Sequence, residues 1–435
     1  MKNFSKKIAI AAIPAVMALS APQAESKILL MSQEGWEVSF DGAANAFIMK
    51  NSITDAPTSA SSGANGAATY ETAGGIMGGT AGGETVGIVT GLLPNVWGMT
   101  LKAPTNNGID FSARLGLYTH MNGGENALGN GQINLRETNG SVSGSFGTIL
   151  IGRSLGIHQS SAILNDMLLF GVGAASSGSN SNTTLGRIGL GYLYTDFQPQ
   201  ISWTTPGLGP IGIKMGVFDP NEVHAETGAI DATELVAPRF EAQITYSTAV
   251  NGVSADMWVD GSYQYTEFST AAQAANWGSQ GELAIGEEGI SSVGGAAGIK
   301  LSYDKFSLVA SGFYGRGMGI RGQHSVGTTE ASTGALDSLG KPRQSYGGYL
   351  QGVADLGVVS VGYSYGGNVQ VQTGNDKSST TVAELNYQDM HSGMIWHNVT
   401  DQFRLVAEGG FSTRNWHMGS DQEDTFGGVG GFFFW

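Results

Sequence analysis

The chain has 435 residues, of which 68 are Gly and only 13% are charged. A typical globular protein has about 7% Gly and about 25% charged residues, so this chain has too few charges to coat a large soluble surface. Its mean hydropathy is nonetheless close to zero, at −0.05. The absence of Cys excludes a disulfide scaffold, a thiolate metal site and a cysteine nucleophile. The formal net charge of −15 argues against nucleic acid as a partner.

Residues 1–24 have the pattern of a secretory signal peptide. A basic start with three Lys precedes an apolar stretch over residues 8–21, and small residues follow. We expect cleavage after Ala24, with cleavage after Ser20 or Ser26 as alternatives; a buried first helix is the competing interpretation. The apolar stretch is shorter than the about 20 residues that a transmembrane helix needs. Cleavage would lower the formal net charge from −15 to −18, because the segment carries three Lys and no acid.

From residue 36 onwards, apolar and polar side chains alternate in segments of about ten residues. In 109–118, Ile, Phe, Ala and Leu alternate with Asp, Ser, Arg and Gly, and similar segments follow at 211–218, 240–246 and 403–412. Alternation places apolar groups on one face of a strand and polar groups on the other. We expect about sixteen strands, with eighteen as the alternative count, which begin near residues 36, 86, 108, 131, 146, 187, 211, 238, 254, 293, 306, 344, 357, 379, 403 and 425.

Two kinds of connection alternate between these segments. Short turns rich in Gly, Pro, Asn and Asp contrast with long polar stretches. This contrast is typical of outer-membrane barrels, whose short turns face the periplasm and whose long loops face outwards. The short turns occur at 104–108, 207–210, 304–305 and 400–401, and the long stretches at 50–84, 156–186, 219–237, 269–291 and 316–343.

These features predict an all-β fold, a transmembrane antiparallel β-barrel over residues 25–435. The apolar strand faces would contact lipid, and the polar faces would surround water. The last segment, from about residue 425, must pair with the first, from Trp36, because unpaired backbone groups in lipid cost several kcal/mol each. A soluble β-sandwich is the alternative, but its surface would need many more charged residues than this chain has.

Residues 144–157, Gly-Ser-Phe-Gly-Thr-Ile-Leu-Ile-Gly-Arg-Ser-Leu-Gly-Ile, resemble the Phe-Gly-Thr-x-x-x-Gly-Arg segment of the Gram-negative general (trimeric) porins. Residues 92–118, with Leu-Leu-Pro and then Ala-Pro-Thr-Asn-Asn-Gly, are similar to one bacterial branch of that family. The resemblance implies a sixteen-stranded outer-membrane barrel, a homotrimer, and passive diffusion of small hydrophilic solutes and ions. It also implies that a long third loop, here 156–186, folds into the lumen. The terminal Trp435 stands where the family usually has Phe.

Three arginines are candidates for a basic patch on the pore wall. Arg114 and Arg136 occupy polar positions of their strands, and Arg136 falls nearly opposite Arg153 if the turn between them centres near residue 145. Arg153 shares the outward parity of its strand, so it reaches the lumen only if the strand bulges near Gly152. In the family that the chain resembles, such a cluster faces acidic loop residues across the constriction. Scattered lumen charges are the alternative interpretation.

The third loop is expected to contain a short helix, because apolar residues recur at four-residue spacing between 163 and 168. Asn165 and Asp166 are its candidate pore-facing residues, and Asp166 is the only acid in 156–186. With a net charge of −18 after cleavage, we expect a mild cation preference. Further lumen candidates at polar strand positions are Lys214, Glu241, Asp256, Asp260, Lys300, Glu384, Arg404 and Glu408.

No motif predicts a cofactor, a resident metal or catalysis. Two GxGxxG matches do not lie between a strand and a helix, as nucleotide binding requires. Ser364 is the centre of a GxSxG match, but it falls inside an alternating segment, where a lumen hydroxyl is the simpler interpretation. Loop acids at 421–424 would hold Ca²⁺ only weakly. The alternatives to a general porin are a channel selective for sugars or organic acids, a hydrolase that uses Ser364, and a structural or adhesive barrel with a plugged lumen.

Overall fold

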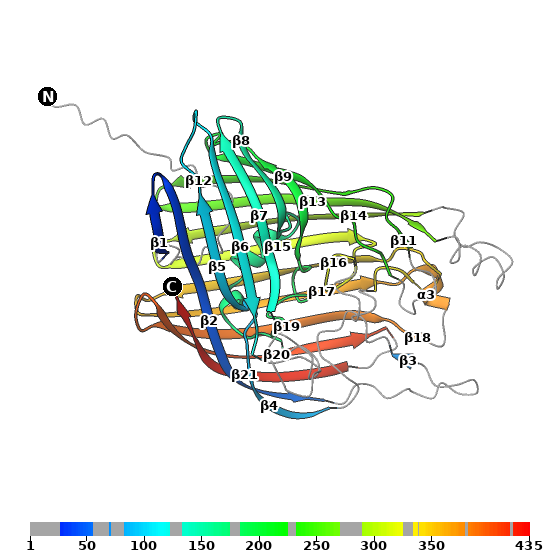
Figure 1. Cartoon of the computed structure of the whole chain (residues 1–435). Coiled ribbons are helices and arrows are strands. Elements are labelled where there is room, and N and C mark those ends of the chain that lie inside the picture. The colour runs from blue at the N-terminus through cyan, green and yellow to red at the C-terminus, as the bar shows by residue number, and fades with distance from the viewer. Residues whose placement is uncertain are drawn as a thin grey trace.

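Sixteen antiparallel strands form one closed ring in the computed structural model (Figure 1). Each ring strand pairs with the next along the chain, and the last strand returns to pair with the first. The predicted barrel and its strand number are therefore confirmed. The structure describes residues 27–54, 69–70, 82–121, 133–174, 183–224, 232–269, 289–324, 334–337, 339–378, 382–417 and 421–435. The expected signal peptide, residues 1–24, lies outside the described residues.

The ring strands are β2 (Trp36–Ile53), β4 (Gly83–Val89) with β5 (Asn95–Lys102), β6 (Asp110–Thr119), β7 (Ile133–Gly144), β8 (Gly147–Leu155), β9 (Phe197–Thr204), β10 (Ile211–Phe218), β12 (Arg239–Val250), β13 (Val253–Phe268), β14 (Gly289–Tyr303), β15 (Phe306–Arg316), β16 (Gln344–Asp355), β17 (Val359–Val371), β19 (Leu385–Asn398), β20 (Phe403–Trp416) and β21 (Asp421–Phe434). β4 and β5 count as one ring strand because they pair, end to end, with the two halves of β2.

Short elements complete the described chain. They are the strands β1 (Ile28–Gln33), β3 (Thr69–Tyr70), β11 (Ala232–Glu234) and β18 (Val382–Ala383), the helices α1 (Ser160–Asn165) and α3 (Gly374–Ser378), and the 3₁₀ helix η1 (Met167–Phe170). Within the described ranges, no helix has the length and apolar character needed to cross a membrane.

Most strands begin within a few residues of the predicted positions. The clear error is the strand expected near residue 187, which begins only at Phe197 as β9. The backbone of residues 183–196 pairs instead with other irregular segments, for example Thr184 N–H with the Thr90 carbonyl, so it does not need a strand ladder. The strand expected near 379 begins at Leu385. The acids at 421–424 lie in β21 and not in a loop.

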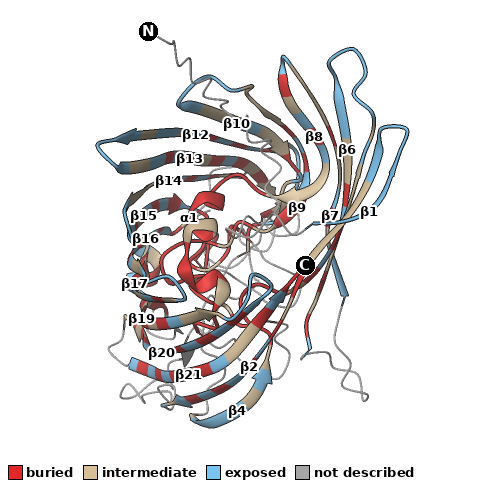
Figure 2. Ribbon diagram, turned by 90° about the vertical axis from the view of Figure 1, so that its left-hand side faces the viewer, coloured by how far each residue is buried: buried red, intermediate tan, exposed pale blue. Residues whose placement is uncertain are grey.

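Along the ring strands most polar residues face inwards and most apolar residues face outwards, although some apolar residues, such as Phe47, Met394 and Phe432, are buried inside. In β17, Ser364 and Asn368 are fully buried inside, whereas Tyr363 beside Ser364 is 57% exposed on the outer face. Figure 2 shows the same alternation of buried and exposed positions, and α1 inside the ring. The alternation read from the segments at 109–118, 240–246 and 403–412 therefore agrees with the facing of their strands, because side chains point to opposite sides with period two.

Exposed aromatic side chains gather at two levels of the outer face. Tyr263, Tyr314 and Tyr346 lie near the strand ends that lead into the long loops. At the short-turn ends, the exposed aromatics include Tyr303, Phe306, Phe403 and Phe433. Aromatic girdles at both edges of an apolar band are typical of transmembrane barrels, since their rings suit the boundary between hydrocarbon and water.

The ring closes at β2 and β21. Eleven consecutive residue pairs join these strands, from Ala43 with Phe434 to Ile53 with Asp424. Beyond them, Gly42 and Trp435 exchange two backbone hydrogen bonds of 2.8 and 3.1 Å. The indole of Trp435 then packs against Trp97, with ring centroids 4.8 Å apart. The terminal residue thus continues the ladder and covers its edge.

We expect Gly42→Val to prevent closure of the barrel. A side chain at Gly42 would collide with the Val96 carbonyl oxygen and the Trp435 ring. Gly352→Val is the matched control, because a Cβ at this outward-facing strand glycine meets no atom within 4 Å. Semi-native gel electrophoresis should show a compact, heat-modifiable band for the control and none for Gly42→Val. A normal compact band for Gly42→Val would contradict this account of closure.

Candidate functional site

The third long loop, residues 156–196, joins β8 to β9, and its described residues, 156–174 and 183–196, lie inside the barrel. Its described residues include α1 and η1, and most of their side chains are buried. The predicted helix forms, but it breaks at Asp166, which has an extended backbone (ψ 126°) and separates α1 from η1. The predicted folding of a long third loop into the barrel is confirmed, although this loop extends ten residues further than expected. We call residues 156–196 the lumen loop.

Lumen carboxylates fasten the start of the lumen loop. Glu241 on β12 accepts hydrogen bonds from the backbone N–H groups of Ile157 at 2.7 Å and His158 at 2.9 Å. Asp260 on β13 accepts from the N–H of Gln159 at 2.9 Å and lies 2.6 Å from Nδ1 of His158. Ionised carboxylates are strong acceptors for exposed backbone N–H groups at such a turn.

Side chains of β16 hold α1. The Tyr349 hydroxyl donates to the carbonyl of Ala162 at 2.7 Å. The Gln351 amide accepts from the N–H of Met167 at 3.0 Å and donates to the carbonyl of Asn165 at 2.7 Å. These bonds satisfy backbone groups at the ends of the two short helices, which have no partner inside a helix.

Glu408 on β20 holds the loop directly after η1, and Asn368 on β17 and Gln388 on β19 bond the backbone of Gly191 and Gly189 further along. The Glu408 carboxylate accepts from the N–H groups of Val172 at 2.7 Å and Gly173 at 2.9 Å, and from the Ser392 hydroxyl at 2.8 Å. Of the lumen acids predicted from the sequence, Glu241, Asp260 and Glu408 thus all bind the lumen loop. Sequence parity indicated their facing correctly but carried no sign of this partner.

Asp166 lies inside the lumen loop and not on a pore-facing surface. It accepts hydrogen bonds from the Tyr192 hydroxyl at 2.9 Å and the Leu168 N–H at 3.0 Å, and its Oδ1 lies 3.6 Å from Nε of Arg187. Burial raises the pKa of Asp166, and Arg187 acts in the opposite direction. Asn165 beside it is half-buried. Of the two residues predicted to face the pore, only Asn165 is therefore partly exposed.

Arg114 does not join the other two candidate arginines. Its guanidinium binds the carboxylate of Asp41 through two nitrogens, at 2.9 and 3.1 Å, and that of Glu137 at 2.9 Å. Two acids on other ring strands therefore neutralise it. The predicted cluster of three arginines is wrong for Arg114, because these carboxylates reach its side chain on both sides.

The structure does bring Arg136 and Arg153 to the same part of the lumen loop. Burial raises the pKa of Asp196, and the charges of both arginines oppose this shift. The Arg136 guanidinium donates to the Tyr194 hydroxyl at 3.3 Å. The irregularity in the sheet is at Arg136, which has no partner on β6; β7 and β8 pair in continuous register through Gly152. The bulge expected near Gly152 is therefore wrong. Gly152 instead adopts φ 126°, a backbone conformation that other residues rarely reach, and Arg153 beyond it comes within electrostatic range of Tyr194 and Asp196 of the lumen loop.

The remaining lumen candidates occupy different levels of the wall. Lys214 on β10 is half-buried and pairs in register with Gln243 and Thr204. Asp256 is exposed, and its register partner on β14 is Lys300. The Arg404 guanidinium donates to Asn398 at 2.8 Å and lies over the ring of Phe170, 5.3 Å from its centroid.

Sequence reasoning missed Tyr194, which contacts Arg136, and Asp196, which lies within electrostatic range of both arginines. They were assigned to a strand expected from residue 187, where the run Gly-Leu-Gly-Tyr-Leu-Tyr alternates like a strand. The Asp at 196 after this run was the available sign of an end, since Asp adopts the left-handed conformation more readily than most residues, and here its φ is 57°.

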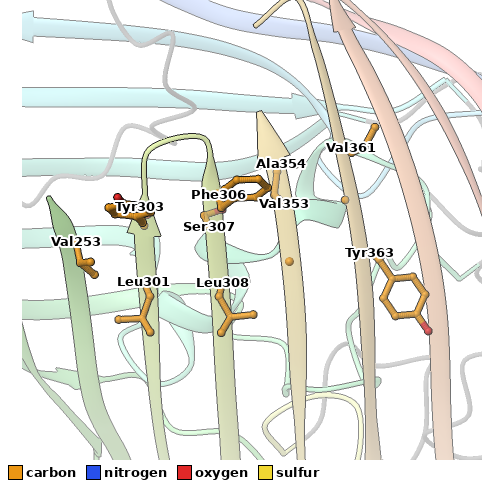
Figure 3. Close-up of a pocket in the computed structure, with 13 residues that line it drawn as sticks. Val253, Leu301, Tyr303, Phe306, Ser307, Leu308, Val353, Ala354, Val361 and Tyr363 are labelled. Atoms are coloured by element: carbon orange, nitrogen blue, oxygen red, sulfur yellow. The ribbon is translucent and has the colours of Figure 1, made fainter. Parts of the chain in front are cut away.

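Other candidate chemistry is not assembled in the described residues. No group of three or more His, Asp and Glu is placed there to hold a metal ion. Ser364 receives a hydrogen bond from Arg187 at 2.5 Å, whereas His391 on the next strand lies on the opposite face and bonds Tyr363 at 2.6 Å. A hollow of about 750 Å³ lies on the lipid-facing side, between Phe306 and Leu308 on one flank and Tyr363 on the other (Figure 3), so it is not part of the lumen.

Neither a protein-family model nor a curated protein matches the sequence. Solved structures of outer-membrane channels do match it, over nearly the whole chain. The outer membrane channel DcaP of Acinetobacter baumannii has a TM-score of 0.61 at 14% identity, covering 93% of this chain and 99% of that one. The anion-selective porin from Comamonas acidovorans has a TM-score of 0.55 at 15% identity, with 92% and 100% covered. OmpF of Salmonella typhi, solved with daunomycin, has a TM-score of 0.50 at 10% identity, with 93% and 99% covered. The chain therefore has the barrel fold of Gram-negative porins.

We expect Glu408→Gln to loosen the lumen loop. An amide offers one oxygen acceptor where the carboxylate offers two, so one of the buried N–H groups of Val172 and Gly173 loses its partner at a cost of about 1–3 kcal/mol. Limited proteolysis should cut the loop faster, and single-channel records should show more flicker than in wild type. Asp256→Asn removes one lumen charge without touching the loop and serves as control. Indistinguishable behaviour of both variants would argue against the anchor.

We also expect acid to destabilise the segment that holds His324. Burial lowers the pKa of His324 to about 3, and the nearby charges of Arg239 and His158 contribute to this shift. The unfolded chain takes up a proton near its ordinary pKa of about 6.5, so stability falls as pH drops from about 6.5 towards 3. The melting temperature on semi-native gels should fall more between pH 7.5 and 4.5 in wild type than in His324→Gln. His397→Gln, at the short-turn side, should behave like wild type.

Proposed function

We propose that the protein is an outer-membrane porin of a Gram-negative bacterium, which lets small hydrophilic solutes and ions diffuse passively through its lumen. The observation that carries the proposal is the closed sixteen-stranded barrel with a lipid-facing outside and a polar inside. A barrel of sixteen strands is wide enough to leave an aqueous channel. The predicted signal peptide supports export, which this location requires.

The packing of the lumen loop supports an opening beside one part of the wall. The loop is fastened to β12, β13, β16 and β20. On the side of β7 to β10, Arg136, Arg153 and Lys214 remain partly exposed. We therefore place the water-filled path between these strands and the loop, with Arg136 and Arg153 on its wall and Asn165 on the partly exposed side of the loop. Arg114 and Asp166 belong to ion pairs that support this arrangement.

A homotrimer is part of the proposal. The outward face of β5 to β8 has a hollow of about 420 Å³. The small residues Ala113 and Gly140 line it together with the larger side chains of Met99, Leu115 and Ile151. Small residues on a membrane-facing surface allow close approach of a neighbouring chain. We propose that a second copy of this chain packs there.

A solute-selective channel has less support. An ordered row of accessible aromatic rings along the lumen would favour it. The inward rings Phe432 and Phe434 are stacked 5.5 Å apart, but they are buried under Phe170 of the lumen loop. They form a packed core between wall and loop and offer no track for a sugar.

Planar-bilayer recording of the purified protein tests the proposal. We expect stepwise conductance that rises with salt concentration, and swelling of protein-containing liposomes in small sugars. A water-filled path predicts no saturation by any one solute. The absence of conductance would favour a plugged structural barrel, and saturable block of the current by one sugar or organic acid would favour the selective channel.

A further inference from the structure

The carboxylates that would make the lumen attractive to cations are largely engaged. Glu241 and Glu408 each accept two backbone N–H groups of the lumen loop, and Asp260 accepts one and faces His158. Donors that point at a carboxylate offset its negative potential at short range. These three carboxylates therefore contribute little to the cation preference that we expected from the net charge.

Arg136 is held in place without a neutralising partner. Its guanidinium lies between two rings, 5.2 Å from the centroid of Tyr118 and 5.6 Å from that of Phe197. Aromatic faces attract a cation but carry no net charge. No carboxylate in the described part of the chain lies within ion-pair distance of Arg136, so its positive charge acts on the lumen.

Arg153 offers a hydrogen-bond donor that the described protein atoms leave unused. Its Nε is shielded from solvent and has no hydrogen-bond partner. The remainder of the side chain is partly exposed. An Arg side chain carries five N–H donors, so the partly exposed remainder of the group offers donors to an acceptor in the lumen.

The loop provides no acidic face opposite this pair. In the whole lumen loop the only acids are Asp166 and Asp196. Asp166 is hydrogen-bonded to Tyr192 and paired with Arg187. Asp196 lies among Arg136, Arg153 and Arg239. Asp196 is half-exposed, but it lies on the side of the arginines and not opposite them. The half-exposed residues of α1 and η1, Leu164, Asn165 and Phe170, carry no charge. The described loop therefore has no acidic side that faces the arginines.

We propose that Arg136 and Arg153 form an anion subsite of the channel, which makes it prefer small anions despite the acidic chain. The ligand class is small oxyanions and halides, because a guanidinium fork matches carboxylate and phosphate oxygens. The proposal rests on the proposed function, since it requires a conducting lumen. It departs from a constriction with opposed basic and acidic sides, which the family resemblance would imply.

The test is the reversal potential of single channels in a KCl gradient, compared among three proteins. Wild type should favour chloride. Arg136→Gln/Arg153→Gln should conduct, with an anion-to-cation permeability ratio lower by at least about fivefold, because the loss of even one of its two unit charges at 4 Å in water has about this effect. Arg316→Gln removes one Arg at the exposed end of β15 and should match wild type.

The outcomes separate the two proposals. A channel that conducts but favours potassium in wild type, or whose ratio is unchanged in the double variant, overturns the anion subsite and leaves the porin intact. A wild-type protein that does not conduct overturns the porin itself. A heat-modifiable band shows that the double variant folds; if it fails to fold, Arg153→Lys keeps the charge but loses the fork, and should retain chloride preference while weakening block by acetate.

Discussion

The constraint on which the structure depends is that a chain in lipid must pair every backbone N–H and C=O group. A sheet meets this requirement only when it has no edge. The antiparallel ring meets it through continuous ladders, and the β2–β21 seam, continued by Gly42 and Trp435, is where the requirement is completed. The low charge content and the strict alternation follow from the same constraint, since one side of every strand contacts hydrocarbon and the other contacts water or the lumen loop.

The same requirement for paired N–H and C=O groups applies to the irregular backbone of the lumen loop. The lumen loop has few ladder bonds of its own, so its N–H and C=O groups take partners from the wall. Glu241, Asp260, Gln351 and Glu408 supply those partners from four strands that are distant in sequence from the loop. A non-helical, non-strand segment is tolerated at membrane depth because it is enclosed by protein. The loop is thus a part of the core of the molecule, and its apolar residues pack with wall residues such as Met394 and Phe432.

Hydrophobic periodicity predicted the barrel, the facing of its strands and the position of the third loop, because burial on one face leaves a signal at every second residue. It failed where pairing depends on distant strands. Arg114 has the same sequence signature as Arg136, yet Asp41 and Glu137 flank it and nothing comparable in the described chain flanks Arg136. The run at 187–195 alternates but is not a strand, since alternation is necessary for a strand and not sufficient. The sequence also gives no sign of the β-bulge at Arg136, because a bulge is an extra residue relative to the neighbouring strand and depends on how the two strands pair.

The use of wall carboxylates as loop fasteners links mechanics to electrostatics in this molecule. An acid such as Glu408 cannot be exchanged to retune the lumen potential without also releasing backbone from the wall. Arg136 and Arg153 form no ion pair with an acid of the described loop. Replacing them should therefore disturb the attachment of the loop less than replacing Glu408. Permeation properties in descendants of this chain should therefore drift through its basic positions, while its inner acids stay fixed.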